Sequence, residues 1–137
     1  MVFRASFCDP FNPTIIELGD IAESQIMRTF DKMPWVDYLT QMQTRGENEI
    51  HFSPSLEIEN KVTRCGLTIS VVGEPEKYEF YVFYKRPKKV ARFFGLTSRM
   101  NNNYLTDAAG ITHQDARDCL QALLDGNDAW LDQIIKS

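Results

Sequence analysis

The sequence predicts an α+β fold in two layers, in which an antiparallel β-meander of three or four strands packs against N-terminal and C-terminal helix pairs. Three observations lead to this prediction. Apolar and polar residues alternate with a period of two over much of the stretch from Glu49 to Lys89, which is typical of half-buried strands. Apolar residues recur at helical spacing on both sides of that stretch. The connections within it are short and polar, which favours hairpins over crossovers.

The segment before the meander predicts two helices. Met1 to Phe7 fits either a short strand or an ordered tail. Asp20 and Glu23 have the spacing of a capping box, so a helix is expected to begin there. Pro34 ends this helix and suits the first position of a second one, which Gly46 closes. The two apolar stripes comprise Ala22, Ile26, Phe30 and Met33, and then Trp35, Tyr38, Leu39 and Met42.

The meander itself is predicted as three strands. The first runs from Glu49 to Glu59, and because Pro54 cannot donate to a ladder, we expect an edge strand or a bulge there. The second runs from Leu67 to Val72. The third, from Tyr78 to Tyr84, is apolar or aromatic on both faces, so we expect it to be covered on both sides. Pro87 is expected to end it.

Two further helices are predicted at the end of the chain. Before them, Val90 to Leu96 fits either a fourth strand or a helical turn, and Thr97 to Asn103 is expected to be irregular. Thr112 suits the N-cap of a helix that ends at Gly126, and the next residues cap the last helix. The apolar stripes of these helices comprise Ala116, Cys119, Leu120 and Leu123, and then Trp130, Leu131, Ile134 and Ile135.

Composition narrows the class of protein. With 137 residues, 43% of them hydrophobic, the chain is expected to form a single domain over residues 1–137. A net charge of −4 and an isoelectric point of about 5.1 argue against a nucleic-acid partner. Three scattered cysteines in no metal-binding spacing predict thiols in a reducing cytoplasm. No apolar run approaches the roughly 20 residues of a membrane span, so no membrane partner is expected.

The most distinctive surface feature is a basic segment, residues 85–92, which holds five of the fifteen Lys and Arg residues: Lys85, Arg86, Lys88, Lys89 and Arg92. No acidic residue lies between positions 85 and 99, although the chain as a whole is acidic. Clustered cations beside aromatic rings can meet an acidic protein surface, or hold phosphate or nucleic acid. The same pattern also fits a solvated strand exit that pairs with the chain's own acidic helices.

A second candidate is the polar face of the first predicted strand, where His51, Glu57 and Glu59 point the same way. Such a face could bind a partner, and a His near a carboxylate could serve as an acid–base pair. However, the strand separates His51 from Glu59 by roughly 26 Å, so these side chains do not converge. No catalytic residue, metal site or cofactor is predicted, because the sequence lacks a phosphate-binding glycine loop, a nucleophile elbow and the CxxC and HExxH spacings.

These features favour a small non-catalytic protein that acts through contact with another protein. In size, isoelectric point and two-layer architecture the chain is similar to small bacterial chaperones and immunity proteins, a resemblance of architecture and composition that implies a binding module. Two other hypotheses remain. One is a phosphate, nucleotide or nucleic-acid binder that uses residues 85–92, and the other is an enzyme with His51 and Glu57 as acid–base pair. An exposed edge strand would also permit a homodimer.

Overall fold

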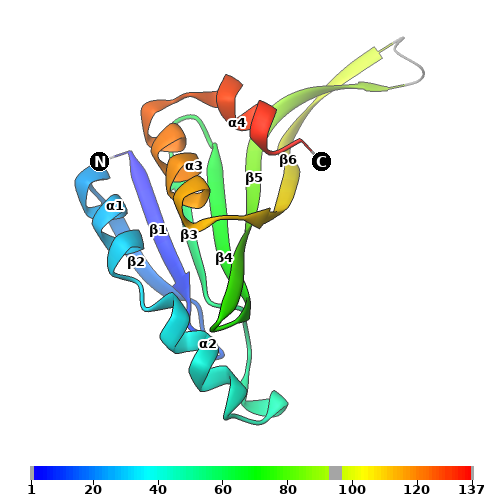
Figure 1. Cartoon of the computed structure of the whole chain (residues 1–137). Coiled ribbons are helices and arrows are strands. Elements are labelled where there is room, and N and C mark those ends of the chain that lie inside the picture. Colours follow the sequence, from blue (N-terminus) through cyan, green and yellow to red (C-terminus); the bar gives the residue numbers. More distant parts are fainter. Residues whose placement is uncertain (1, 93–96, 137) are drawn as a thin grey trace.

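The computed structural model describes the backbone of residues 2–92 and 97–136, and the side chains of these residues except 89–92, 97–99 and 102. Six antiparallel strands form one sheet in the order β2-β1-β3-β4-β5-β6, and the helices lie together on one of its faces (Figure 1). The elements are β1 (Phe3–Cys8), β2 (Ile16–Ile21), α1 (Glu23–Lys32), α2 (Trp35–Gln43), a 3₁₀ turn (Glu47–Glu49), β3 (Ser55–Asn60), β4 (Gly66–Glu74), β5 (Lys77–Arg92), β6 (Thr97–Ile111), α3 (His113–Asp125) and α4 (Asp128–Ile134).

The α+β class and the antiparallel sheet are confirmed. The finer architecture differs from the prediction, because the sheet has six described strands instead of three or four. The first pair of helices is also central in the chain and not N-terminal, since β1 and β2 precede it. The two strands pair with each other, and β1 also pairs with β3, so the N-terminal hairpin extends the meander at its far side.

The start of α1 was predicted two residues too early. Asp20 belongs to β2, and Ala22 is the N-cap residue of α1. The side chain of Gln25 accepts a hydrogen bond from the backbone N–H of Ala22 at 3.3 Å, so a capping interaction exists but with other residues. The strand β2 was not predicted because most of its side chains are exposed and only Ile21 is buried, which leaves no apolar period to detect.

The first predicted strand of the meander is shorter and more central than expected. It begins at Ser55 and not at Glu49, and it lies between β1 and β4, so the prediction of an edge strand is wrong. Pro54 precedes the strand, is buried, and accepts a hydrogen bond from the N–H of Val71 at 3.1 Å. A proline just before a strand loses no ladder hydrogen bond, which explains why it does not mark an edge.

The β4–β5 hairpin matches the prediction, but β5 continues to Arg92 and Pro87 does not end it. The pairing of β5 with β6 shifts register between Arg86 and Lys88, so a bulge accommodates the missing N–H of the proline. The segment 97–103, expected to be irregular, is part of β6. The predicted segment Val90 to Leu96 belongs to β5 up to Arg92, and its remainder lies outside the described residues.

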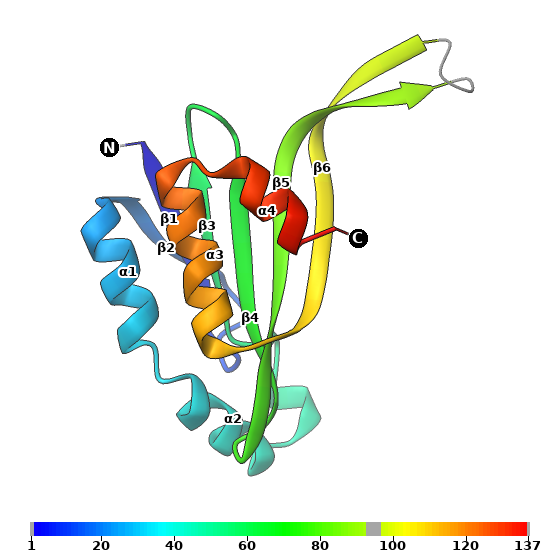
Figure 2. The same cartoon turned by 45° about the horizontal axis from the view of Figure 1, so that its top comes forward.

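One face of the sheet and the inner sides of the helices form the core. The largest fully buried side chains are Tyr84, Phe30, Phe80, Ile26, Leu56, Ile58, Leu67, Ile69, Leu120, Leu131, Ile135 and Val71. On the other face of β5, the rings of Tyr81 and Phe83 stack 4.6 Å apart and are only half-buried. None of the described helices covers this face in either view (Figure 2), so the prediction that β5 is covered on both sides is wrong. We call this face the open face.

The C-terminal helices agree with the prediction. The hydroxyl of Thr112 accepts a hydrogen bond from the N–H of Asp115 at 3.1 Å and caps α3. Gly126 ends this helix with φ of 72°, a left-handed conformation that favours glycine. Asn127 caps α4 by accepting from the N–H of Trp130 at 3.3 Å. Among the described residues, no helix is both long and apolar enough to span a membrane.

Candidate functional site

The structure divides the predicted basic segment between the body of the protein and a projecting part. Lys85 and Arg86 lie in the body, where each is bound to a carboxylate of the chain itself. Lys85 Nζ donates to Glu59 Oε2 at 3.1 Å, and Arg86 Nη2 donates to Asp132 Oδ1 of α4 at 2.8 Å. For Arg86, this geometry corresponds to the interpretation in which the basic segment pairs with the chain's own acidic helices. These two side chains are therefore occupied.

Arg86 is more enclosed than Lys85, with 7% of its surface exposed. Its guanidinium lies 4.2 Å from the ring centroid of Tyr84 and 4.7 Å from that of Tyr104. Its Nη1 atom donates to the hydroxyl of Thr106 at 2.6 Å, and this hydroxyl donates to the carbonyl of Ile135 at 2.9 Å. The side chain thus joins β5, β6 and the C-terminal helix α4 at one point, which orients the strands that continue beyond it.

Beyond Arg86, strands β5 and β6 leave the sheet together as a two-stranded ribbon, and in both views it projects past α4 (Figures 1 and 2). We call residues 87–92 and 97–103 the β-arm. The backbone pairing continues along it, from Lys88 opposite Asn101 to Arg92 opposite Thr97. Its sequence contains Lys88, Lys89, Arg92 and Arg99 and no acidic residue. Three of the five predicted basic residues therefore lie on a part of the fold that extends away from the acidic body.

The described side chains of the β-arm add apolar surface to this charge. Met100 is 52% exposed. The Lys88 ammonium lies 4.7 Å from the ring centroid of Tyr104, at the base of the β-arm. Aromatic residues, Met and Arg are enriched at protein–protein interfaces, whereas Lys is depleted there, so Met100 and Tyr104 are the described side chains that fit such a contact best.

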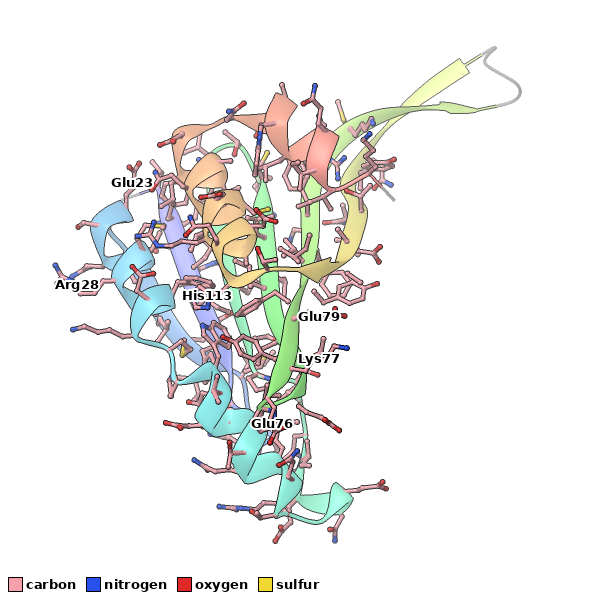
Figure 3. All side chains as sticks on the ribbon, in the orientation of Figure 1. Glu23, Arg28, Glu76, Lys77, Glu79 and His113 are labelled. Atoms are coloured by element: carbon pink, nitrogen blue, oxygen red, sulfur yellow. The ribbon has the colours of Figure 1, made fainter. Side chains whose placement is uncertain are left out.

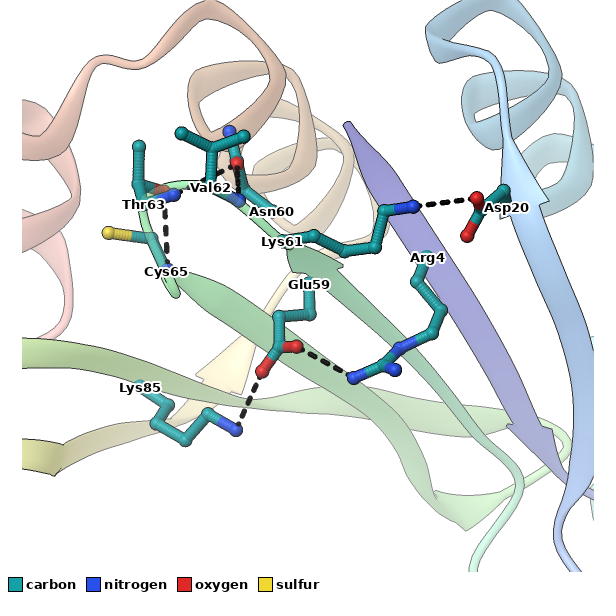
Figure 4. A network of polar contacts seen from close by, with 9 residues as sticks. All are labelled: Arg4, Asp20, Glu59, Asn60, Lys61, Val62, Thr63, Cys65 and Lys85. Atoms are coloured by element: carbon teal, nitrogen blue, oxygen red, sulfur yellow. Dashed lines mark hydrogen bonds and ion pairs between the residues drawn. The ribbon is translucent and has the colours of Figure 1, made fainter. Parts of the chain in front are cut away.

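The second predicted site, around Glu59, forms an ion bridge on the open face (Figure 4). Glu59 is 8% exposed and receives hydrogen bonds from Arg4 on β1 at 2.9 Å and from Lys85 on β5 at 3.1 Å. Burial alone would raise the pKa of Glu59, but the hydrogen bond from Lys85 and the charges of Lys85 and Arg4 outweigh it and hold the pKa below its ordinary value. Glu59 therefore links three strands and is unavailable to a partner.

Glu57 lies on the same strand face but remains exposed. It lines a hollow of about 310 Å³ together with Arg4, Ser6 and Glu17, and it also lines a smaller one of about 190 Å³ beside Phe83 and Leu105.

His51 is not part of this face, because it precedes β3. Its backbone N–H donates to the carbonyl of Pro10 at 2.7 Å, and it lines neither of the two hollows that Glu57 lines. The predicted grouping of His51 with Glu57 and Glu59 assumed one continuous strand from position 49 to 59. The structure does not bring these three residues to one surface, since the strand begins only at Ser55.

The three cysteines are free thiols. Burial raises the pKa of Cys119 to about 12, with a further contribution from Asp115 and Asp118. Burial likewise raises the pKa of Cys65 and of Cys8, the latter also through the charge of Glu57. A thiol with a raised pKa is a weak nucleophile at neutral pH. Within the part of the chain that the structure describes, no cluster of three or more His, Cys, Asp or Glu side chains could hold a metal ion.

Comparison with known proteins adds no further constraint: no family model matches the chain, and no curated protein or solved structure is significantly similar to it. The geometry must therefore carry the functional argument. Sequence reasoning found the charge of the β-arm but not its shape. The available signal was the absence of acidic residues between positions 85 and 99, which marks a segment unlike the rest of the acidic chain but does not reveal its conformation.

Proposed function

We propose that this protein acts through protein–protein contact and not through catalysis, and that its β-arm docks on an acidic surface of the partner. The observation that carries this proposal is the position of the β-arm, which projects beyond the helices and presents only basic charges (Figure 2). A ribbon of two strands with no covering layer buries little apolar surface of its own. Contact with a partner provides the burial that such a ribbon lacks.

The distribution of charge supports an acidic partner. The β-arm carries four basic and no acidic residues, so the remaining residues have a net charge of −8. A partner with a negative patch is attracted by the β-arm and repelled by the body, which favours docking at one end of the molecule. Charge complementarity of this kind orients the encounter and raises the association rate, and the effect weakens as salt increases.

The contact chemistry of the β-arm is consistent with a protein surface. Met100 offers a flexible apolar side chain, and Met is enriched at surfaces that adapt to a partner. Tyr104 at the base holds its ring against Lys88 and Arg86, which keeps both cations in fixed positions. Arg86 in turn fixes the base of the β-arm to α4 through Asp132. The partner therefore meets a ribbon whose direction is already set.

The test is affinity capture from the cells that make the protein, with three immobilised forms compared by quantitative mass spectrometry. These are the wild type, the double variant Lys88→Gln with Lys89→Gln, and the control Lys77→Gln with Lys136→Gln. The control removes the same charge from exposed positions on the body. We expect a partner with an acidic surface to be retained by the wild type and the control, and to be lost from the β-arm variant and at high salt.

Nuclease treatment of the lysate distinguishes a protein partner from the alternative that the basic segment binds nucleic acid. Capture that survives the nuclease supports direct contact between proteins. Capture that disappears after it would instead indicate nucleic acid as the ligand of the β-arm and overturn the proposal. The proposal also fails if every captured protein is retained equally by the β-arm variant and the control.

A further inference from the structure

The opposite edge of the sheet holds a second surface with a defined chemistry, a groove between β2 and α1. The groove has a volume of about 390 Å³ and is lined by Leu18, Asp20 and Ile21 from β2 and by Gln25, Arg28, Thr29 and Lys32 from α1. We call it the β2–α1 groove. The strand order places β2 and β6 at the two ends of the sheet, so this groove is far from the β-arm in the fold.

The outer edge of β2 has no neighbour among the described strands. The backbone N–H and C=O groups of an edge strand are free to pair with an added chain. Beside this edge, Leu18 is 41% exposed, and Ile15 and Ile16 are also exposed. The pairing of β1 with β2 shifts register between Ala5 and Ser6, which leaves Leu18 as an extra residue on β2. The edge therefore combines unpaired backbone with apolar side chains.

The α1 side of the groove is cationic. Arg28 and Lys32 take part in none of the ion pairs found among the described residues. Figure 3 shows Arg28 projecting from the outer side of α1, away from α3. Of the acidic side chains on β2 and α1, Asp20 is paired with Lys61 at 2.6 Å and Asp31 with Arg117 at 2.9 Å, whereas Glu17 and Glu23 belong to no ion pair found among the described residues. Asp20 is the acidic residue in the lining of the groove. The two free cations thus set the charge that a ligand in the groove encounters.

A second copy of the chain does not fit this surface well. Pairing two β2 edges around a two-fold axis would bring both α1 helices to the same junction. Gln25, Arg28, Thr29 and Lys32 would then face their own symmetry equivalents, and the four cations would repel one another. A ligand that brings acidic groups avoids this repulsion.

We propose that the β2–α1 groove binds an extended, acidic segment of a partner protein by adding a strand to β2. The spacing of the cations specifies the pattern. Arg28 and Lys32 are four residues apart on a helix, which is about 6 Å along its axis. Alternate residues of a strand are about 6.6 Å apart and share one face. Two acidic residues separated by one position therefore match the two cations, and an apolar residue two positions further contacts Leu18 and Ile21.

In this mode of recognition, affinity and specificity come from different contacts. Main-chain hydrogen bonds to β2 supply affinity for any extended segment, and the side chains on the groove-facing side select the sequence. The site is separate from the β-arm and does not depend on the function proposed for it. A protein that uses both surfaces would contact its partner, or two partners, at opposite ends of one sheet.

The test is a selection from a displayed library of random octapeptides on the folded full-length protein. Enriched peptides are then synthesised and their affinities are measured by fluorescence polarisation. We expect enrichment of two acidic residues at alternate positions next to an apolar one. The variant Arg28→Glu with Lys32→Glu should bind these peptides at least about tenfold more weakly, which corresponds to about 1.4 kcal/mol.

Two controls distinguish the groove from general charge effects. Lys77→Glu with Lys136→Glu changes the net charge by the same amount and should leave the affinity unchanged, as should Lys88→Gln with Lys89→Gln on the β-arm. Amide chemical-shift mapping should place the peptide along β2 and α1. No enriched peptide, enriched peptides without the acidic pattern, equal losses in the groove variant and its charge control, or shifts centred elsewhere would each overturn the inference.

Discussion

Replacement of Glu59 by Gln tests whether the ion bridge on the open face stabilises the fold. The substitution keeps the size of the side chain but removes the negative acceptor of two hydrogen bonds, from Arg4 and Lys85. A hydrogen bond to a charged group contributes about 1.5–3 kcal/mol. The side chains of the two cations are 54% and 35% exposed, so water compensates part of the loss. We expect the free energy of unfolding to fall by about 1–3 kcal/mol.

The loss should also depend on pH. Although burial alone would raise the pKa of Glu59, Lys85 and Arg4 hold it below its ordinary value of 4.5. A carboxylate with a lowered pKa stabilises the folded state fully above its unfolded-state pKa, and this contribution disappears as the pH falls through the folded-state pKa. The difference between the wild type and Glu59→Gln should therefore be constant from neutral pH to about pH 5 and shrink below it.

Urea unfolding, followed by tryptophan fluorescence at a series of pH values, measures this difference. Glu57→Gln is the matched control, because Glu57 lies on the same strand and face but is exposed. Its effect should stay below about 0.5 kcal/mol. The reasoning is refuted if the loss for Glu59→Gln at neutral pH is no larger than that of the control. It is equally refuted if the loss persists unchanged down to about pH 3.

Three further predictions concern stability and reactivity. Arg86→Met leaves the hydroxyl of Thr106 and the carboxylate of Asp132 without their donor, so the free energy of unfolding should fall by about 2–4 kcal/mol. Asp132→Asn should lower it less, because the side chain of Asp132 is half exposed. Equal losses for the two variants in urea unfolding would contradict this. Leu120→Ala should cost about 2–5 kcal/mol by opening a cavity beneath α3, and a loss as small as that of its exposed neighbour in Gln121→Ala would contradict the packing. A thiol reagent at mildly alkaline pH should modify Cys65 and Cys119 only after unfolding, because both thiols are buried and have raised pKa values. Rapid labelling of these two cysteines in the folded protein would contradict this.

The elements that the sequence predicts well are those whose own side chains decide their structure. In α3, the cap at Thr112, the apolar stripe and the left-handed Gly126 all act within one helix, so a local pattern is sufficient. The β4–β5 hairpin is similar, since its turn and the flanking alternation are contiguous. The stripe of α2 was also recognised from its spacing, with Trp35 and Leu39 buried as expected.

The elements that were missed depend on residues far away in the chain. β2 is recognised only through its pairing with β1, because its own side chains are mostly exposed. The central position of β3 follows from β1 returning beside it, which no pattern within residues 49–59 reveals. Pro87 breaks a local strand pattern, yet a bulge in β6 opposite Pro87 absorbs it. His51 was assigned to the same strand as Glu57 and Glu59, but that strand begins only at Ser55 and His51 precedes it.

The net charge of the chain is a poor guide to the charge that a partner meets. From Pro87 to Arg92 the β-arm extends about 17 Å, at roughly 3.3 Å per residue. The screening length at physiological ionic strength is about 8 Å, so the outer half of the β-arm is largely screened from the acidic body. A partner there encounters the local positive charge and not the overall value of −4. The same reasoning applies at the β2–α1 groove, where Arg28 and Lys32 are in no ion pair among the described residues and Asp20, which also lines the groove, is paired with Lys61. An acidic isoelectric point is therefore compatible with two basic binding surfaces at opposite ends of one sheet.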